Sequence, residues 1–114
     1  MKFILFSLVG TALLLVSCSK DDKQRQKDSM LILVSQEAVQ SKLKDGASAE
    51  FRNVGIHKGQ KPNLVCGEVN SKNGFGGFSG YQRFISAGTA ELTFLEEQMK
   101  RGEMDISWDR FCRS

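Results

Sequence analysis

Three cysteines, Cys18, Cys66 and Cys112, are the residues whose chemistry the sequence indicates most clearly. A cysteine sulfur can carry an acyl chain, pair in a disulfide, bind a metal or act as a nucleophile. A metal site needs more soft ligands than two cysteines and the lone His57 supply, and the C-x-x-C spacing of redox proteins is absent. We therefore expect no metal and no cofactor, and the surroundings of each cysteine decide between acylation and pairing.

Cys18 ends an N-terminal segment that has the layout of a secretory signal. Lys2 supplies the basic start, and Phe3 to Val16 is an apolar and small-residue run, shorter than the about 20 residues of a membrane span. The last four residues, Leu15 to Cys18 (LVSC), resemble the lipobox of bacterial lipoproteins, in which the signal is cut before an acylated cysteine. We expect a signal peptide over 1–17 and palmitate-type acylation of Cys18. The alternative is an ordinary secretory signal with a cysteine near the cut by chance.

The residue after the modified cysteine bears on the membrane in which a lipoprotein resides. In Gram-negative lipoproteins an Asp at this position tends to retain the protein in the inner membrane, and here the residue is Ser19. Two or more acyl chains hold a protein stably on a lipid surface. The resemblance therefore implies a lipid-anchored, periplasm-facing protein of the outer membrane.

Cys66 and Cys112 remain in an oxidising compartment, where thiols tend to pair. A disulfide between them would stabilise the fold by about 4 kcal/mol on the chain-entropy model. The mature chain is short enough to form one small domain with a limited core, which benefits from such a bond. The formal net charge of the sequence, +3, is too small to indicate a nucleic-acid partner.

The elements that position these residues follow from the hydrophobic pattern. Residues Ser19 to Ser29 are charged or polar throughout, so 18–29 is predicted to be a flexible, lipidated tether. A helix is predicted over Met30 to Lys44. Strands are predicted at Glu50 to His57, Asn63 to Asn70, Gly80 to Ala87 and Thr89 to Leu95, and a short terminal element at Asp105 to Cys112. This order predicts one α+β domain over 30–114, with the N-terminal helix packed on a small antiparallel sheet of about four strands and a short C-terminal element.

The stretch from Asn73 to Tyr81 (NGFGGFSGY) combines glycines with aromatic residues. The glycines do not match G-x-G-x-x-G and no G-K-[ST] follows, so a phosphate-binding loop is disfavoured. Asn73-Gly74 favours a hairpin turn instead. The three aromatic residues, Phe75, Phe78 and Tyr81, either cover the sheet or form a recognition surface, and both interpretations stay open.

The other reactive residues do not assemble into a catalytic site. His57 is alone in a charged context, and Ser79 lacks the G-x-S-x-G spacing of a nucleophile elbow. Glu96 and Glu97 are adjacent and would face different ways, which makes a poor acid–base pair. We therefore expect a protein that is not an enzyme.

Two blocks of the sequence resemble a known group of proteins. The blocks are LKDGASAEFRNV (43–54) and VCGEVNSKNGFGGFSGYQRF (65–84), and a cysteine lies close to the C-terminus. The group consists of small exported proteins of Gram-negative bacteria and their prophages, with the pattern L-K-D-P-x-S-A-x-F followed by V-C-G-x-V-N-x-K-N. This sequence departs from it at Gly46, where proline is usual. The resemblance supports export and the pairing of Cys66 with Cys112, and it implies no activity.

These observations lead to two expectations about function. The first is a non-enzymatic outer-membrane lipoprotein that is anchored through Cys18 and binds an envelope partner through the aromatic residues of the glycine-rich stretch. The alternative is an inhibitor or immunity protein that acts against a wall-degrading or toxin enzyme. The sequence indicates no oligomeric state.

The lipobox yields the first testable prediction. Replacing Cys18 by Ala removes the acylated sulfur, so we expect the precursor to stay uncut by the lipoprotein signal peptidase and any processed product to appear in the soluble periplasm. Membrane fractionation and mass spectrometry of the N-terminal peptide check this. Unchanged fractionation together with an unmodified Cys18 peptide in the wild type would contradict lipidation.

Overall fold

The computed structural model describes residues 20–59 and 61–113. The predicted signal peptide and Cys18 lie outside the described residues. The elements are α1 (Lys20–Lys42), η1 (Gly46–Ser48), β1 (Glu50–His57), β2 (Leu64–Asn70), β3 (Gln82–Ser86), β4 (Thr93–Leu95), η2 (Glu96–Gln98) and α2 (Glu103–Phe111). The predicted α+β class is confirmed.

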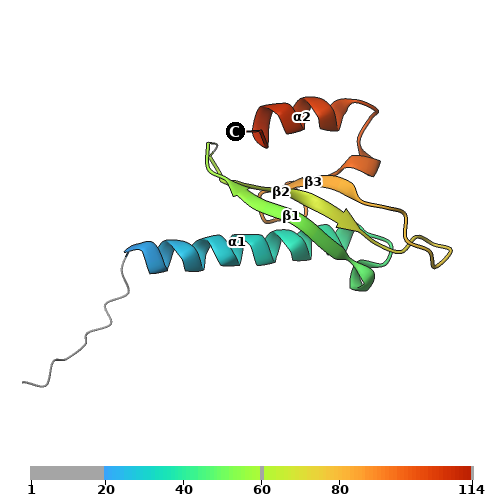
Figure 1. Ribbon diagram of the computed structural model, residues 1–114, viewed down its shortest axis with the longest axis horizontal. Coiled ribbons are helices and arrows are strands. Elements are labelled where there is room, and N and C mark those ends of the chain that lie inside the picture. Colours follow the sequence, from blue (N-terminus) through green and yellow to red (C-terminus); the bar gives the residue numbers. More distant parts are fainter. Residues whose placement is uncertain (1–19, 60, 114) are drawn as a thin grey trace, which may run out of the picture.

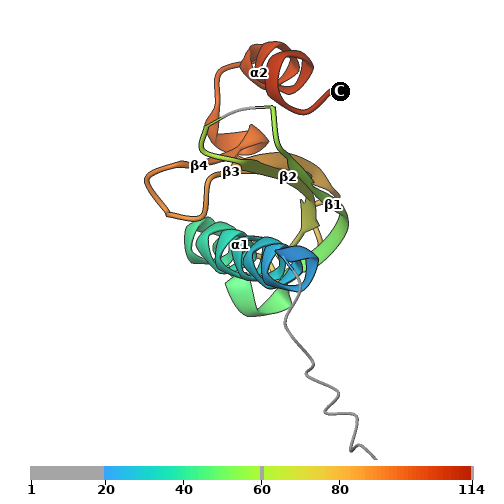
Figure 2. The ribbon, with the colours of Figure 1, turned by 90° about the vertical axis from the view of Figure 1, so that its left-hand side faces the viewer.

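The strands form one antiparallel sheet in the order β1-β2-β3-β4, so each strand pairs with the next one along the chain. Helix α1 runs along one face of this sheet and α2 lies over the other (Figure 1). Figure 2, which looks along α1, shows the sheet between the two helices. The chain therefore builds a three-layer arrangement in which both sheet faces need apolar side chains.

The first core lies between α1 and the sheet. Side chains alternate between the two faces of a strand, and Val65, Val69 and Phe84 point from β2 and β3 toward the helix, where they meet buried Val39 and Leu43. Gly67 lies between the two valines, and a Cβ atom there would come within 2.9 Å of the Phe84 ring. A glycine at this position thus leaves room for the Phe84 ring beside the strand.

The second core lies between the sheet and α2 and is smaller. Its buried members are Cys66, Ile85, Met104 and Cys112. The sulfur atoms of Cys66 and Cys112 are 2.02 Å apart, the distance of a disulfide bond, and the two Cα atoms are 6.0 Å apart. The bond joins strand β2 to the end of α2, 46 residues further along the chain.

Arg83 provides the second attachment of α2 to the sheet. Its guanidinium donates to both carboxylate oxygens of Glu96, at 3.2 and 2.6 Å, and to Asp105 Oδ1 at 2.5 Å. The carbon of the guanidinium lies 5.6 Å from the centroid of the Trp108 ring. The hydrogen bonds from Arg83 lower the pKa of the Glu96 carboxyl and raise that of the guanidinium. Both groups therefore stay charged, and the first half of α2 is held against β3.

The predicted flexible tether differs from the structure, in which α1 begins at Lys20 and continues without a break through residue 30. The segment contains good helix formers and no glycine or proline, and Asp21 and Asp22 lie in the first turn, where carboxylates favour the helix dipole. Asp28 accepts from Gln24 one turn earlier and from Lys58 of the β1–β2 connection, both at 2.9 Å. The prediction of a flexible tether is therefore wrong for residues 20–29.

Several other boundaries shift by one to four residues. Strand β3 begins at Gln82 instead of Gly80, and β4 begins at Thr93 instead of Thr89, because Gly80 and Gly88 adopt positive φ angles of 96° and 100° that interrupt an extended chain. Helix α2 begins at Glu103, directly after Gly102.

Within the described parts of the chain, no helix is both long enough and apolar enough to cross a membrane.

The attachment of α2 yields a prediction about stability. A Cys112→Ser variant loses the covalent link to β2, so we expect its free energy of unfolding to fall by about 2–5 kcal/mol, the usual cost in small secreted domains. An Ile106→Ala variant, which changes an exposed residue of the same helix, should stay within about 0.5 kcal/mol of wild type. Chemical denaturation measures both values. Alkylation of Cys66 and Cys112 in the unreduced native protein would contradict the bond.

Candidate functional site

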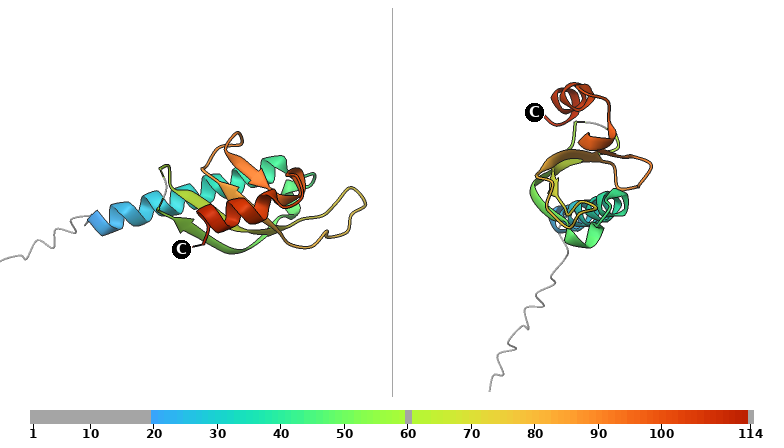
Figure 3. Two further views of the ribbon diagram at one scale, coloured as in Figure 1. Left: turned by 90° about the horizontal axis from the view of Figure 1, so that it is seen from above. Right: turned by 90° about the vertical axis from the view of Figure 1, so that its right-hand side faces the viewer.

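Residues 71–81 connect β2 to β3 as a narrow hairpin, called the arm below. It extends past the end of the sheet, as Figure 3 shows. The backbone of Ser79 donates to Ser71 O at 3.1 Å, and Lys72 pairs with Phe78 as an isolated antiparallel bridge. The arm therefore continues the β2–β3 pairing in a looser form beyond the sheet.

A turn centred on Asn73 fixes the shape of the arm tip. The Asn73 side-chain oxygen accepts hydrogen bonds from the backbone N–H groups of Phe75, at 2.9 Å, and Gly77, at 3.3 Å. The Asn73 backbone adds two more bonds, to Gly76 and Gly77. Gly76 has a φ of 83°, a conformation that residues with a side chain rarely adopt. The prediction of a turn at Asn73-Gly74 agrees with this geometry, which limits the conformations open to the tip.

The three predicted partner-binding residues all lie on the surface. Phe75 at the tip is 100% exposed, Phe78 is 47% exposed and Tyr81 at the base of the arm is 38% exposed. Of the two interpretations left open by the sequence, covering of the sheet is therefore wrong for Phe75. The side chains are available for contact with another molecule.

Two cations lie against the aromatic rings of the arm. The Arg52 guanidinium lies 3.6 Å from the centroid of the Tyr81 ring, and Lys72 Nζ lies 5.8 Å from that of Phe78. Both distances are within the range of cation–π attraction. The rings of Phe78 and Tyr81 thus have a preferred orientation in the free protein, and Phe75 has no ring–cation contact of this kind among those observed in the described residues.

A bulge in β1 brings Arg52 to this position. The β1–β2 register shifts between Arg52 and Gly55, and Asn53 has a φ of 54°, which Asn tolerates better than most residues. Glu68 on β2 accepts from Arg52 at 3.1 Å and from the Asn53 amide at 2.9 Å. These bonds lower the pKa of the Glu68 carboxyl, with the bond from Arg52 as the largest cause. None of these three residues was identified from the sequence.

Lysines gather around a hollow at the base of the arm. A hollow of about 360 Å³ lies between the arm base, the end of α1 and η2. Its charged lining residues within the described chain are Lys42, Lys44, Lys72 and Glu97. Lys42 Nζ donates to Thr93 O at 2.5 Å, and the Lys44 and Lys72 residues are exposed. The surface of this hollow is therefore basic.

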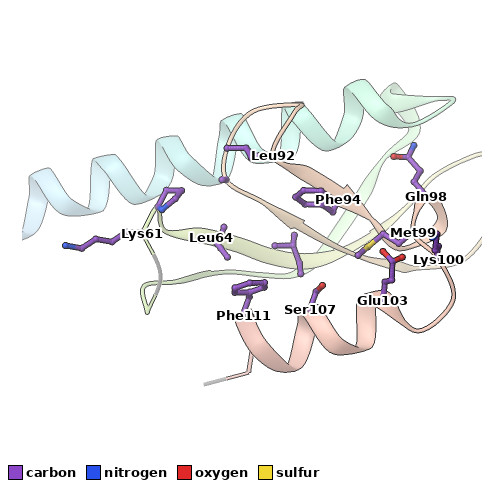
Figure 4. A pocket seen from close by; sticks show the side chains of 13 residues that line it. Lys61, Leu64, Leu92, Phe94, Gln98, Met99, Lys100, Glu103, Ser107 and Phe111 are labelled. Atoms are coloured by element: carbon purple, nitrogen blue, oxygen red, sulfur yellow. The ribbon is translucent and has the colours of Figure 1, made fainter.

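A second hollow, on the opposite face of the sheet from α1, was not predicted either. It has a volume of about 720 Å³ and lies between α2 and strands β2, β3 and β4 (Figure 4). The lining residues come from four separate stretches of sequence, so no local motif signals the site. The clearest sign of this hollow is that Leu92 and Phe94 are exposed, although the neighbouring β4 residues Thr93 and Leu95 are buried.

The residues considered for catalysis are kept apart. His57 pairs with Leu64 at the start of β2, whereas Ser79 lies on the arm beyond the other end of that strand. The Glu96 carboxylate is engaged by Arg83. Across residues 20–59 and 61–113, no cluster of three or more His, Cys, Asp and Glu side chains is arranged to hold a metal ion.

Comparison of the chain with protein-family models, with curated proteins and with solved structures gave no match. The functional interpretation therefore depends on the geometry of the arm and of the two hollows.

The Asn73 turn yields a prediction about the dynamics of the arm. Asn73→Ala removes one side-chain acceptor from two backbone N–H groups, worth about 1 kcal/mol. We expect hydrogen exchange at the Phe75 and Gly77 amides to speed up about fivefold, the factor that this energy corresponds to. The melting temperature should fall by several degrees at most, because about 1 kcal/mol corresponds to about 4–8 °C in a domain of this size.

Nuclear magnetic resonance of the labelled domain measures the exchange at each amide. Ser79→Ala serves as the control, because its hydroxyl makes only a long bond of 3.5 Å to Ser71 O. Equal exchange at the tip in the Asn73→Ala variant and the wild type would show that the turn does not restrain the arm.

Proposed function

We propose that the protein is a non-enzymatic lipoprotein, anchored in the outer membrane through acylated Cys18 and facing the periplasm, which binds an envelope protein through the arm. The observation that carries this proposal is the full exposure of Phe75 on a turn of restrained shape. A large apolar side chain in this position adds nothing to either core of the domain.

The construction of the arm favours binding to a protein. Aromatic residues are frequent hot spots, because a single ring can bury a large apolar area in a partner. A turn that is already ordered loses less conformational entropy on binding than a flexible loop. The hydrogen bonds to Asn73 and the cations beside Phe78 and Tyr81 provide this order before any partner arrives.

The charges around the arm indicate the chemistry of the partner. Lys44 and Lys72 line the hollow at the base of the arm, with Glu97 as its acidic lining residue, and Lys72 also lies beside Phe78. An acidic rim around an apolar pocket would complement this surface, and such charges increase the rate of association. We therefore expect binding to weaken as the salt concentration rises.

An inhibitor or immunity protein is the second candidate, and the shape of the arm favours it. The tip residue Phe75 is flanked by Gly74, Gly76 and Gly77, so little bulk surrounds the ring. A slender projection of this kind fits a concave site better than a flat one. The active-site cleft of a wall-degrading or toxin enzyme is such a site, and an acidic cleft would also attract the neighbouring lysines.

Helix α1 is suited to hold the domain away from the membrane. Its first turns extend beyond the sheet and past the contact between Asp28 and Lys58 (Figure 1). At about 1.5 Å per residue, the part before Met30 adds about 15 Å. In the proposed arrangement a helix, rather than a flexible tether, follows the lipid anchor almost directly.

The proposal predicts that binding and folding separate at the arm. Phe75→Ala should melt at the wild-type temperature, because the ring contacts neither core. Its affinity for the partner should fall by about 30-fold, as for a hot spot worth about 2 kcal/mol. Crosslinking in intact envelopes followed by pull-down and mass spectrometry identifies the partner, and titration with that purified protein measures the affinity.

Ile106→Ala provides the matched control, because Ile106 is 72% exposed but lies on α2, away from the arm. A folded Phe75→Ala variant that binds the partner as tightly as wild type would contradict the proposal. If the partner is a wall-degrading enzyme, its activity on peptidoglycan should fall with the wild-type domain and stay unchanged with the variant, which separates the inhibitor from a simple binding protein.

A further inference from the structure

The hollow beside α2, called the groove below, has no part in the proposed function of the arm. Its volume of about 720 Å³ falls within the range of about 300–1,000 Å³ for small-molecule sites. One wall is the sheet face opposite α1 and the other is α2 (Figure 4). A helix of 9 residues is too short to cover a face made by three strands, so the groove stays open along one side.

The walls of the groove are apolar. The main apolar side chains are Leu64, Ile85, Leu92, Phe94, Met99 and Phe111. Leu92 and Phe94 are each about half exposed and line the same cavity as Ile85 of the second core. Met99 is flexible and polarizable, so it can adapt to an occupant. This lining would bury an alkyl chain well.

The polar side chains lie at the ends and along the helix side of the groove. Lys61 lies at one end, and Gln98 and Lys100 lie at the other (Figure 4). A peptide in the groove would bring backbone N–H and C=O groups that need partners, and the middle of the sheet-side wall offers apolar side chains. An alkyl chain needs no such partners.

The charges at the ends indicate the head group of the occupant. Among the described lining residues, Lys61 and Lys100 are cations and Glu103 is the anion. The ends of the groove therefore carry an excess of positive charge, and Lys61 has no acidic neighbour in the lining. This arrangement complements a molecule with an apolar chain and an anionic end.

The groove is held open by covalent and ionic bonds at both ends of α2. The Cys66–Cys112 disulfide fixes the last turn, and the ion pair between Arg83 and Asp105 fixes the first turns. Because these links set the distance between helix and sheet, α2 cannot move freely across the sheet to cover Leu92 and Phe94. The cavity is thus a built feature of the fold.

We propose that the groove binds a medium-chain fatty acid, with the alkyl chain between α2 and the sheet and the carboxylate beside Lys61 or Lys100. This goes beyond the function of the arm, which lies past the end of the sheet. It would let a domain close to a membrane bind a single lipid chain independently of its protein partner.

Titration of the intact protein with dodecanoate, followed by calorimetry and by the fluorescence of Trp108, tests the proposal. Trp108 is the single tryptophan of the sequence and packs on the second core beside the groove. We expect saturation at one site. Ser107→Phe places a ring into the groove from α2. It should lower the affinity for dodecanoate at least tenfold without lowering the melting temperature.

Ile106→Phe is the matched control, because it adds the same ring at the preceding position of the helix, which is exposed and outside the groove. It should bind dodecanoate like wild type. Equal affinity in the Ser107→Phe variant and the wild type, or no saturable binding by the wild type, would overturn the proposed site.

The role of charge is tested with a neutral ligand of the same chain length. A Lys61→Gln/Lys100→Gln variant should bind dodecanoate several-fold more weakly and bind dodecanol like wild type. Equal binding of dodecanoate by this variant and the wild type would overturn the assignment of an anionic head group. Both results are independent of whether the arm binds a protein.

Discussion

The fold depends on one constraint: a short chain must cover both apolar faces of its sheet, and its second helix is too small to do so by packing alone. Helix α2 has 9 residues, below the length at which isolated helices are stable in water. The Cys66–Cys112 disulfide and the ion pairs of Arg83 hold it in place. The second core exists because these bonds bring Met104 and Ile85 together.

The same constraint explains where the molecule is left open. Helix α1 has 23 residues and runs along its face of the sheet, whereas α2 leaves part of the other face exposed as the groove. The arm is free of both helices, because residues 71–81 extend beyond the sheet that they join. Its shape depends instead on local bonds to Asn73 and on cations beside Phe78 and Tyr81.

Much of the fold followed from local sequence patterns, which also singled out the aromatic residues of the arm, whereas the groove was not predicted. Strand β2 was predictable because residues 63–70 are rich in β-formers, and the cysteine pair because Cys66 and Cys112 are the two cysteines left over in a protein predicted to be exported. The start of α1 was missed because charged residues suit both a solvated helix and a coil. The exposure of Phe75 was one of two interpretations that the sequence left open. The groove beside α2 depends on how distant segments meet, which composition alone does not specify.

Site-specific photocrosslinking tests the central claim, that the arm is the surface that meets an envelope partner. A photoreactive phenylalanine analogue replaces Phe75 in one sample and the exposed Ile106 in another, and intact cells are irradiated. We expect position 75 to give a covalent adduct with one envelope protein and position 106 to give none. An adduct from position 106 with none from position 75 would contradict the claim and place the binding surface on α2.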